Sequence, residues 1–452
     1  MKLYDISRPF EDRVEAFRSG SVPVAVYGLG KMGLPLAAVY ADTCHNVIGA
    51  DVDESVVETI NEGRSHVKRE PGLSDLVSAV VTDGSLRATS DPQSAAADAT
   101  VHVVIVPTLV DAQNEPDLSV LQSVARDIAS GLEAGDIVIL ESTVPPRTCA
   151  DVLEPLLVEA SGLDAQEFGL AFCPERTASG RALEDIRGAY QKIVGGIDRE
   201  STDLARMIYE EINDAGVIAV SDTTTAEAVK VFEGVYRDVN IALANELGTF
   251  ADDLDIDVTE AIEAANTLPY CNLHTPGAGV GGHCIPYYPH FMIGQFESSS
   301  PLMETARSVN DSMPAFTVDK LLKGLNEQGT TLSDATVVVL GLTYRAGVEE
   351  IRHAPSLPIV DRLVDQCASV YVVDPILEDF SAFDGSKPIS RDEIYDVDPD
   401  AAVLVTAHEE FDGIDWEQFQ DQLVVVDGRQ ALDIDGTDHW VYTIGAGWIE
   451  QE

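Results

Sequence analysis

The sequence is poor in positive charge. Among its 452 residues, 28 are Lys or Arg and 78 are Asp or Glu, which gives a formal net charge of −50. Such a surface repels nucleic-acid phosphates, so we expect no nucleic-acid partner. The acidic residues are spread along the chain and do not form one tail. We therefore predict a solvated acidic surface adapted to high salt, where a short Debye length screens self-repulsion.

Long apolar runs and paired cysteines are also absent from the sequence. No stretch of about 18 apolar residues could cross a bilayer, and the start, MKLYDISRPFEDR, lacks the apolar core of a signal peptide. The six cysteines stand singly, without a CxxC pair, a zinc-binding pattern or a disulfide framework. We therefore expect a cytoplasmic protein without a membrane segment or a metal site.

A nucleotide-binding fingerprint lies near the N-terminus. The apolar segment 22–27 reads as a buried strand, and Gly28, Gly30 and Gly33 follow it as GLGKMG before a helical apolar run. A second predicted strand, 46–50, ends at Asp51, where a carboxylate meets the ribose hydroxyls of a dinucleotide. The strand, turn, helix and carboxylate together predict an NAD site, with Asp53 as an alternative ribose ligand.

Strands and helices alternate beyond this fingerprint, which predicts a parallel sheet covered by helices. The further strands are predicted at 102–108, 136–143, 168–175 and 192–196. Thr108, Glu141 to Thr143 and Glu175 end three of them. We expect these residues to converge on one crevice, because ligands of open α/β sheets sit beyond the carboxyl ends of the strands.

The second half of the chain contains a long helix and a second α/β unit. Apolar residues at helical spacing predict about 33 residues of helix from Asp222, which Ser221 or Asp222 caps. A second strand–loop–helix–strand pattern begins at Ala335 and reaches Asp374 without a GxGxxG. The fold class is therefore α/β, with two Rossmann-like doubly wound domains joined by a long central helix. The predicted regions are an extension (1–20), an NAD-binding domain (21–221), a central helical region (222–325) and a C-terminal domain (326–452).

A single thiol in a glycine-rich loop is the most informative feature of the sequence. The segment 277–286 reads GAGVGGHCIP, and Cys284 lies beside glycines that let the backbone approach a ligand closely. A thiolate there can act as a nucleophile. The alternative is a tight loop around a buried structural thiol.

These motifs together resemble those of the nucleotide-sugar 6-dehydrogenases, the family that oxidises UDP-glucose, GDP-mannose or UDP-N-acetylhexosamines to uronates. The resemblance covers about residues 21 to 430 and is closest to the UDP-N-acetyl-D-mannosamine branch. The motifs that carry it are GLGKMGLPLA (28–37), ESTVPP (141–146), CPER (173–176), AEAVKVFEGVYRDVNIALANEL (226–247), GAGVGGHCIP (277–286) and GLTYRAGVEEIRHAP (341–355).

The resemblance implies NAD as cofactor, a UDP-sugar substrate, a homodimer and a twofold oxidation at C6 through a thioester on Cys284. It implies that Lys230 stabilises an oxyanion, that Glu175 is the base for hydrolysis and that Thr143 positions water. The structural alternatives are an exposed helix lysine at Lys230, a Glu175–Arg176 salt bridge, and a strand-end turn or helix cap at Thr143. The implied cofactor ligands are Gly28, Gly30, Lys31, Met32, Gly33, Asp51, Thr108 and Thr143, and the implied substrate ligands are Arg237, Asn240, Gly281, Arg345 and Arg352.

Two positions depart from the family pattern. Gly234 stands where the family usually has Asn, and Tyr288 stands where it usually has Asp. A phenol cannot act as a carboxylate base at neutral pH. The leading hypothesis from the resemblance is NAD-dependent 6-oxidation of UDP-N-acetyl-D-mannosamine or UDP-N-acetylglucosamine. We keep two alternatives: a UDP-glucose 6-dehydrogenase and, because of Gly234 and Tyr288, a weakened homologue that binds nucleotide sugar and NAD without completing the hydrolysis. Pairing with Glu349 or Glu350 is the alternative for Arg345 and Arg352.

Overall fold

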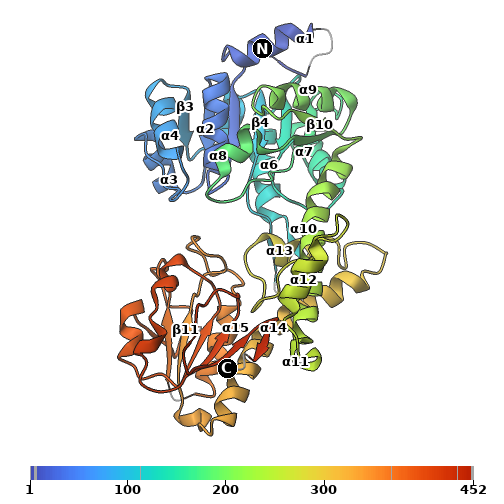
Figure 1. The fold of residues 1–452 in the computed structure, drawn as a ribbon. Helices are drawn as coiled ribbons and strands as arrows, with labels where there is room; N and C mark the ends of the chain where they lie inside the picture. Colours follow the sequence, from blue (N-terminus) through green and yellow to red (C-terminus); the bar gives the residue numbers. More distant parts are fainter. Residues whose placement is uncertain (1, 5–7, 112, 368, 435, 449–452) are drawn as a thin grey trace. The chain divides into compact units, whose positions relative to one another are not determined.

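The computed structural model describes residues 2–4, 8–111, 113–367, 369–434 and 436–448. They form two compact units, one of residues 1–233 and 290–295 and the other of residues 234–289 and 296–452 (Figure 1). Positions 1 and 5–7 of the predicted extension lie outside the described residues.

The first unit is built on a sheet of eight described strands in the order β10-β9-β8-β7-β4-β1-β2-β3. All neighbouring pairs are parallel except β8 and β9. The strands are β1 (Val24–Tyr27), β2 (Val47–Ala50), β3 (Leu86–Thr89), β4 (Val101–Val104), β7 (Ile137–Leu140), β8 (Gly169–Phe172), β9 (Lys192–Gly196) and β10 (Val217–Ala219); β5 (Leu109–Val110) and β6 (Pro116–Asp117) form a separate ribbon.

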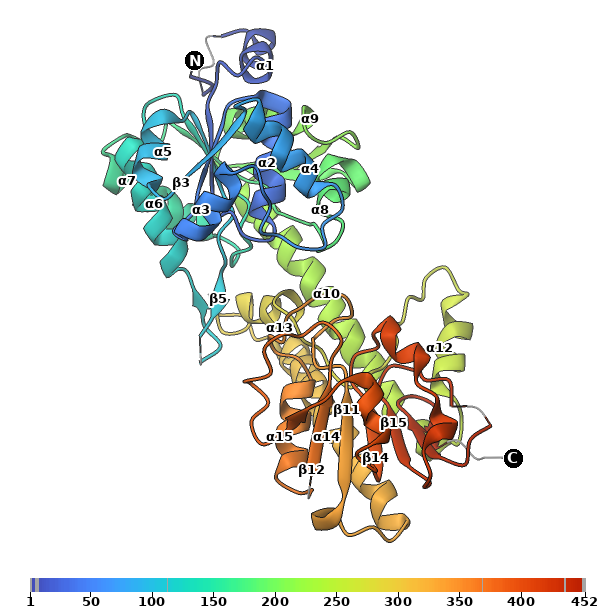
Figure 2. The same cartoon turned by 90° about the vertical axis from the view of Figure 1, so that its left-hand side faces the viewer.

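Helices cover both faces of this sheet (Figure 2). Val24 and Val26 of β1 belong to one apolar core and Ala25 and Tyr27 to the other, because successive strand residues point to opposite faces. The helices are α1 (Phe10–Arg18), α2 (Gly33–Cys44), α3 (Glu54–Asn61), α4 (Leu73–Thr82), α5 (Pro92–Asp98), α6 (Ser119–Gly131), α7 (Glu154–Ser161), α8 (Ala182–Glu184) and α9 (Arg199–Glu210), with π-helical turns η1 (Cys149–Leu153) and η2 (Asp185–Ala189).

The described part of the N-terminal extension packs on this unit. Leu3 and Phe17 are fully buried, and the backbone N–H groups of Leu3 and Tyr4 donate to the carbonyl of Gly135. Lys2 Nζ lies 2.7 Å from the buried carboxylate of Asp136. The extension is therefore a docked part of the first unit.

The second unit is built on a sheet of seven described strands in the order β13-β12-β11-β14-β15-β16-β17, parallel except for β16 and β17. The strands are β11 (Thr336–Leu340), β12 (Ser369–Val373), β13 (Lys387–Pro388), β14 (Ala401–Leu404), β15 (Val424–Asp427), β16 (Trp440–Thr443) and β17 (Gly447–Trp448). Two apolar cores again lie on opposite faces of the sheet, with Val337 and Val339 in one and Val338 and Leu340 in the other.

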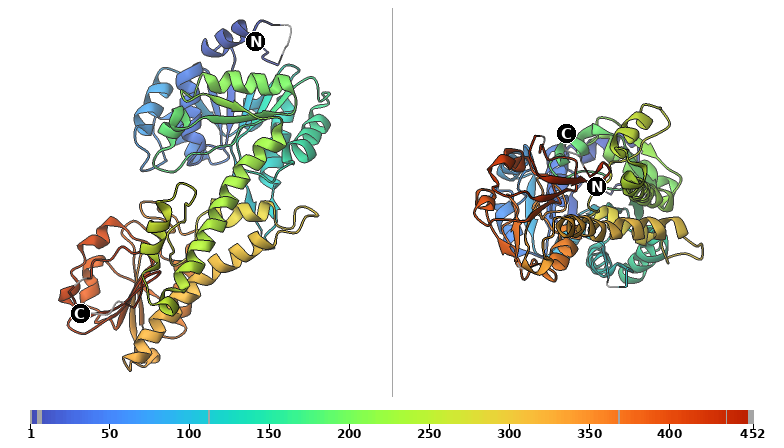
Figure 3. Two further views of the ribbon diagram at one scale, coloured as in Figure 1. Left: turned by 45° about the vertical axis from the view of Figure 1, so that its right-hand side comes forward. Right: turned by 60° about the horizontal axis from the view of Figure 1, so that its bottom comes forward.

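Helices α14 and α15 cover one face of the second sheet, and short 3₁₀ turns cover the other. The helices of this half of the chain are α10 (Thr223–Thr249), whose first residues belong to the first unit, α11 (Ala251–Leu254), α12 (Val258–Asn266), α13 (Cys284–Tyr287), α14 (Pro301–Glu327) and α15 (Ser356–Val364). The 3₁₀ turns are η3 (Tyr288–Phe291), η4 (Leu332–Asp334), η5 (Arg391–Tyr395), η6 (Glu409–Gly413) and η7 (Trp416–Gln418). Figure 3 shows α14 in yellow-orange beside the yellow-green second half of α10.

The predicted α/β fold with two doubly wound sheets is confirmed, but several boundaries differ. The predicted helix from Asp222 is interrupted, because the N–H of Phe250 bonds to Leu247, three residues back, and tightens the turn after Thr249. Asp222 caps its start, since its Oδ1 accepts from the N–H of Thr225 at 2.7 Å. Among the described residues, no helix is both long and apolar enough to cross a bilayer.

Candidate active site

The glycine turn after β1 has the geometry of a dinucleotide-binding turn. Gly28 has φ +91° and its N–H donates to Ala50 at 2.9 Å, which bends the chain at the end of the strand. A side chain on Gly33 would collide with the carbonyl of Gly28, so α2 begins directly against the turn. Nothing lies within 4 Å of the side-chain position of Gly30, which leaves room for a close ligand. The N-terminus of α2 supplies N–H groups and a dipole suited to pyrophosphate.

Asp51, not Asp53, is coupled to this turn. The carboxylate of Asp51 accepts from the N–H of Leu29 at 2.7 Å and from the N–H of Asp53 at 3.0 Å. Asp53 instead caps α3, where it accepts from Ser55. The remaining lone pairs of Asp51 suit ribose hydroxyls. Of the other predicted cofactor ligands, Lys31 is exposed and Met32 is half-buried, with its sulfur 3.0 Å from the hydroxyl of Thr177.

The loops after β4 and β7 lie side by side and carry the two predicted threonines. Their strands are neighbours, and the N–H of Val106 donates to the hydroxyl of Ser142 at 2.8 Å. Strands β4 and β7 end at Val104 and Leu140, so Thr108 and Thr143 lie in loops and not in strands. Among the described residues, nothing hydrogen-bonds to the buried hydroxyl of Thr108. A cofactor hydroxyl or amide would satisfy that group, so these loops fit a dinucleotide.

Lys230 and Glu175 meet within the first unit. The Lys230 ammonium lies 3.9 Å from the Glu175 carboxylate, and both side chains are more than four-fifths buried. Lys230 is therefore not an ordinary solvated helix lysine. Glu175 also accepts from the N–H of Thr177, whereas Arg176 pairs with Glu233, so the alternative Glu175–Arg176 salt bridge is wrong.

A second buried ion pair lies beside Glu175, and sequence analysis did not predict its partners. Lys192 Nζ lies 2.7 Å from the buried Glu141 carboxylate, which also accepts from the Tyr209 hydroxyl. Burial raises the pKa of Glu141, and the contacts with Lys192 and Tyr209 lower it without cancelling the rise. These three residues and Glu175 line a solvent-open hollow of about 420 Å³. Glu141 lies near the end of a predicted strand, but Lys192 and Tyr209 are distant in sequence and could not be paired with it.

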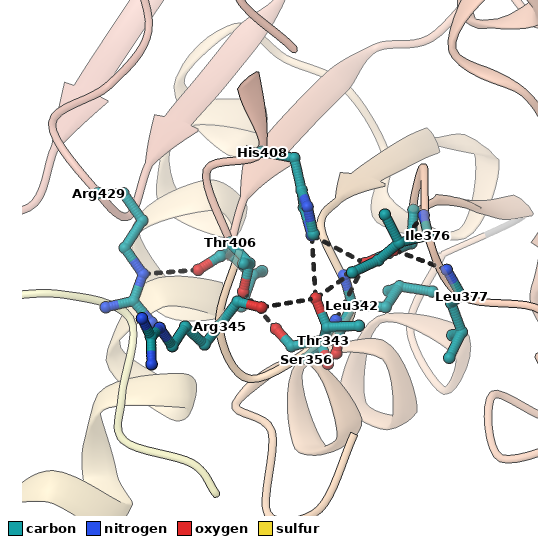
Figure 4. A network of polar contacts seen from close by, with 11 residues as sticks. Leu342, Thr343, Arg345, Ser356, Ile376, Leu377, Thr406, His408 and Arg429 are labelled. Atoms are coloured by element: carbon teal, nitrogen blue, oxygen red, sulfur yellow. Dashed lines mark hydrogen bonds and ion pairs between the residues drawn. The ribbon is translucent and has the colours of Figure 1, made fainter. Parts of the chain in front are cut away.

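The second sheet repeats the turn of the first with different chemistry (Figure 4). Gly341 has φ +82° and donates to Val373, as Gly28 donates to Ala50. The carboxylate of Asp374 accepts from the N–H groups of Leu342 and Thr343 and, with its other oxygen, from those of Ile376 and Leu377. Its Oδ2 also lies 3.2 Å from Nε2 of His408. Asp374 thus holds the turn together and is fully engaged.

The glycine-rich loop places Cys284 at the first residue of α13, in the second unit. All six cysteines are among the described residues, and Cys284 is the exposed one. The glycines pack the loop against another segment of the protein: a side chain on Gly281 would lie 2.7 Å from the carbonyl of His353 and 2.8 Å from Tyr344. Gly282 has φ +92° and donates to the carbonyl of Arg352 at 2.8 Å. The alternative of a buried structural thiol is wrong.

The predicted substrate ligands fall into two groups. Arg345 is exposed, and Arg352 has its Nε 3.7 Å from Glu350, the alternative partner. The loop that carries them contacts the Cys284 loop, so both arginines belong with the thiol. On α10, Arg237 is exposed, and Asn240 donates to the carbonyl of Tyr236 within its own helix.

A buried polar chain that sequence analysis missed anchors the start of the thiol loop. Arg307 pairs with the fully buried Asp238 at 2.6 Å, and Asn310 donates to the same carboxylate. Asn245 donates to Asn310 and accepts from the N–H of Gly277, both at 2.9 Å. Helices α10 and α14 therefore fix the residue at which the glycine loop begins. The signal available was a set of polar residues at helical spacing in a helix otherwise read as an apolar spine.

A dinucleotide turn, a second nucleotide-type turn, a buried lysine–carboxylate pair and an exposed thiol define an NAD-dependent oxidoreductase with a second nucleotide-binding domain. Comparison with known families assigns the three parts of the chain separately. Residues 22–213 match the NAD binding domain, residues 224–312 the central domain and residues 338–434 the UDP binding domain of one family. The chain belongs to the UDP-glucose/GDP-mannose dehydrogenase family and is an NAD-dependent nucleotide-sugar dehydrogenase.

Three relatives show which members of the family this chain resembles. The chain is 34% identical over 417 residues to the UDP-N-acetyl-D-mannosamine dehydrogenase of Methanococcus aeolicus, covering 92% of this chain and 91% of that one. It is 34% identical over 410 residues to the NDP-N-acetyl-D-galactosaminuronic acid dehydrogenase of Ralstonia nicotianae, covering 89% and 94% of the two chains. The solved UDP-D-ManNAc dehydrogenase of Pyrococcus horikoshii matches with a TM-score of 0.87 at 32% identity, covering 94% of this chain and 99% of that one.

Proposed function

We propose that this enzyme oxidises C6 of a UDP-N-acetylhexosamine to the carboxylate, with UDP-N-acetyl-D-mannosamine as the preferred substrate. Relatives that carry this name or act on related N-acetylated nucleotide sugars align with nearly the whole chain. Cys284 carries the proposal, because it is the exposed thiol among the six and begins a helix in a glycine-rich loop.

The proposed reaction consists of two oxidations and a hydrolysis that proceed through the thiol of Cys284. Loss of a hydride from C6 and of the hydroxyl proton leaves an aldehyde, and the Cys284 thiolate adds to its carbon to give a thiohemiacetal. Loss of a second hydride and of the thiohemiacetal hydroxyl proton leaves a thioester. Water then adds to the thioester carbon and the C–S bond breaks, which releases the carboxylate and a proton and restores the thiol, whose own loss of a proton regenerates the thiolate. NAD, when bound, accepts one hydride in each oxidation. Two molecules of NADH should therefore form per sugar.

Polar side chains assist these steps. The Lys230 ammonium stabilises the oxyanion that forms when the thiol adds to the aldehyde, and Glu175 takes a proton from the hydrolytic water. Their separation of 3.9 Å supports a shared role. Thr143 positions the water, and Arg345 and Arg352 bind the diphosphate.

Replacement of Cys284 by Ser tests this function. We expect Cys284→Ser to form no uronate while NAD binding, measured by calorimetry, stays within about twofold of the wild type. The matched control is Cys271→Ser, a second thiol of the same unit that is not fully exposed, which should retain turnover. Undiminished uronate formation by Cys284→Ser would refute the thioester route.

Two alternatives give different results in the same assays. A UDP-glucose 6-dehydrogenase would show its highest kcat/KM with UDP-glucose in a panel of UDP-sugars followed by NADH formation. A weakened homologue, suggested by Gly234 and Tyr288, would stop at the thioester and leave a sugar adduct on Cys284 in the intact-protein mass. Two NADH per sugar without an accumulating adduct would exclude the weakened homologue.

The exposed face of α10 supports a homodimer. Tyr236 and Leu243 in α10, and Phe250 directly after it, follow one another at intervals of seven residues and are each about half exposed, as is Leu254 in α11. Such a stripe is typical of a helix that packs against a partner, here a second copy of the chain. Sedimentation in high salt should give a dimer, and Leu243→Glu should give a monomer. A wild-type monomer would refute this assembly.

The net charge supports adaptation to high salt, and melting temperature measured across a KCl series tests it. We expect the melting temperature to rise from dilute buffer to molar KCl, because salt screens repulsion among 78 acidic residues. Equal melting temperatures in both conditions would refute it.

A further inference from the structure

The two positions that depart from the family pattern contact each other. Gly234 in α10 and Tyr288 at the start of η3 belong to the same compact unit, and Tyr288 is only 9% exposed. A Cβ built on Gly234 would lie 2.9 Å from both Cβ and Cγ of Tyr288, and closer still to the ring edge at Cδ2. Real Cβ atoms essentially never show such distances. The Tyr288 side chain therefore lies directly on the bare backbone of α10.

The same tyrosine is part of the turn that carries the thiol. Cys284 begins α13, Tyr288 follows it by four residues, and η3 continues α13 without a break. Residues four apart in a helix share a face, so a displacement of Tyr288 is passed directly to Cys284.

The other side of this turn is held independently. The Tyr287 hydroxyl and His353 Nε2 are 3.0 Å apart, and His283 pairs with Glu350. With one side fixed to the 350–353 segment, the Tyr288–Gly234 contact sets how closely the turn approaches α10. Any atom added at position 234 pushes the turn away from the helix.

We propose that Tyr288 is a positioning residue for Cys284 and that Gly234 and Tyr288 are a matched pair, each identity depending on the other. This inference rests on the proposed role of Cys284 as nucleophile. The two departures are then one coupled replacement and not two separate losses. Tyr288 supplies packing, and the proton transfers of hydrolysis fall to Glu175.

A double-mutant cycle tests the pair with four variants: Gly234→Ala, Tyr288→Ala, the combination of both, and Tyr288→Phe. We expect Gly234→Ala to lower both kcat and the rate at which iodoacetamide alkylates Cys284 by about tenfold or more, because a displacement near 1 Å is costly for a reacting group. KM for the UDP-sugar and Kd for NAD should stay within about threefold. Tyr288→Phe keeps the ring and should retain the alkylation rate, whereas Tyr288→Ala should lower it.

The melting temperature of Gly234→Ala should change in opposite directions with and without the contact to Tyr288. Glycine is unfavourable inside a helix, so without the contact Gly234→Ala would raise the melting temperature. The clash predicts a fall instead. Adding Tyr288→Ala to Gly234→Ala should raise both melting temperature and alkylation rate from the values of Gly234→Ala to those of Tyr288→Ala alone, because the smaller side chain removes the clash.

Two outcomes would refute the proposed pairing of Gly234 and Tyr288. One is additive effects of the two substitutions, and the other is a Gly234→Ala variant that is more stable than the wild type and is alkylated at the wild-type rate. If Gly234→Ala does not fold, soluble recovery of the double variant still supports the pair, and failure of both refutes it. Alkylation and melting are measured without substrate, so they remain decisive even if Cys284→Ser shows that the thioester route is wrong.

Discussion

The two sheets begin with the same turn and use it differently. In both, a glycine with positive φ follows the first strand, and a carboxylate at the end of the next strand accepts the N–H of the residue after that glycine. Asp51 accepts two backbone N–H groups and keeps lone pairs for a ligand. Asp374 accepts four backbone N–H groups, so its capacity is spent within the protein. The carboxylate at this position thus keeps free acceptor capacity in the first unit and is used within the protein in the second.

The distance from the turn to the next helix explains the difference. In the first unit α2 begins at Gly33, five positions after Gly28, so the helix N-terminus lies at the turn. In the second unit α15 begins at Ser356, fifteen positions after Gly341. The longer loop brings side chains, including Arg345 and Arg352, to the place where the first unit offers backbone N–H groups. The first turn therefore suits a dinucleotide pyrophosphate, and the second suits a diphosphate held by guanidinium groups.

The largest expected effect is on stability, and it distinguishes Asp374 from Asp51. Asp374→Asn should lower the free energy of unfolding by about 3 kcal/mol or more, because an amide oxygen cannot accept from all the donors and buried N–H groups remain unsatisfied. Asp51→Asn should lower it by about 1 kcal/mol or less while raising Kd for NAD at least about tenfold. Urea unfolding and calorimetry measure the two quantities. Equal destabilisation by both variants would refute the proposal that Asp51 is a ligand carboxylate and Asp374 a structural one.

Acid titration gives a second view of Asp374. Burial alone would raise its pKa, but hydrogen bonds from His408, Ile376, Leu342 and Thr343 outweigh that effect and lower the pKa to about 2. Since an unfolded Asp titrates near about 4, the stabilisation is complete above pH 4 and is lost as the pH falls to about 2. Asp374→Asn should flatten the unfolding free energy in this window. An unchanged acid profile would contradict the assignment.

The next effect concerns the helix that follows each turn. Gly33→Ala should raise Kd for NAD by about a hundredfold, because its side chain would collide with the carbonyl of Gly28 and displace α2 from the turn. UDP binding by the second unit should not change, which makes it the internal control. The fifth residue after Gly341 is already alanine, the exposed Ala346, and Ala346→Gly should leave both affinities unchanged. If Gly33→Ala binds NAD as the wild type does, NAD binding does not require α2 to lie directly against the turn.

A smaller effect tests the arginines of the second loop. Arg345→Ala should raise KM for the UDP-sugar by about tenfold through loss of a charge-assisted hydrogen bond, with Kd for NAD unchanged. Arg362→Ala is the matched control, because Arg362 lies in the same unit but pairs with Asp319 and the carbonyl of Ala315. Steady-state kinetics with each substrate varied in turn measure both. A change in NAD affinity and not in KM would reverse the assignment of the two turns.

Local patterns predicted the first turn better than the second. GLGKMG, its flanking strand and Asp51 lie within about thirty residues, and local sequence dictates their geometry. Asp374 was recognised as a strand end, but its saturation depends on His408, which other strands bring to it. The pairing of Glu141 with Lys192 and Tyr209, and the chain from Arg307 to Gly277, likewise join residues more than thirty positions apart. A single sequence records such residues but not their contacts.

The same limit applies to Gly234 and Tyr288. Each was visible as a departure, and separately each suggested a lost catalytic group. Their contact across 54 positions is the observation on which the proposed pairing rests. The short edge strand β3 was missed because it lacks the apolar run of the central strands, as Arg87 illustrates.

The smallest effect contrasts the pH responses of the two units. Burial raises the pKa of Glu227, at the start of α10, to about 7, although the backbone N–H groups of Cys149 and Arg147 donate to it and lower it in part. Because the folded state then holds a proton that the unfolded state releases, stability is greatest below the unfolded pKa and falls as the pH rises through 7. This is opposite to the response of Asp374. The free energy of unfolding should drop by about 1 kcal/mol between pH 6 and pH 8. Glu227→Gln should remove this slope. It should also lower the overall stability, because the amide keeps only one acceptor oxygen. The control is Glu246→Gln, at an exposed position on α10, which should leave the slope intact. A slope that persists in Glu227→Gln would place the titrating group elsewhere.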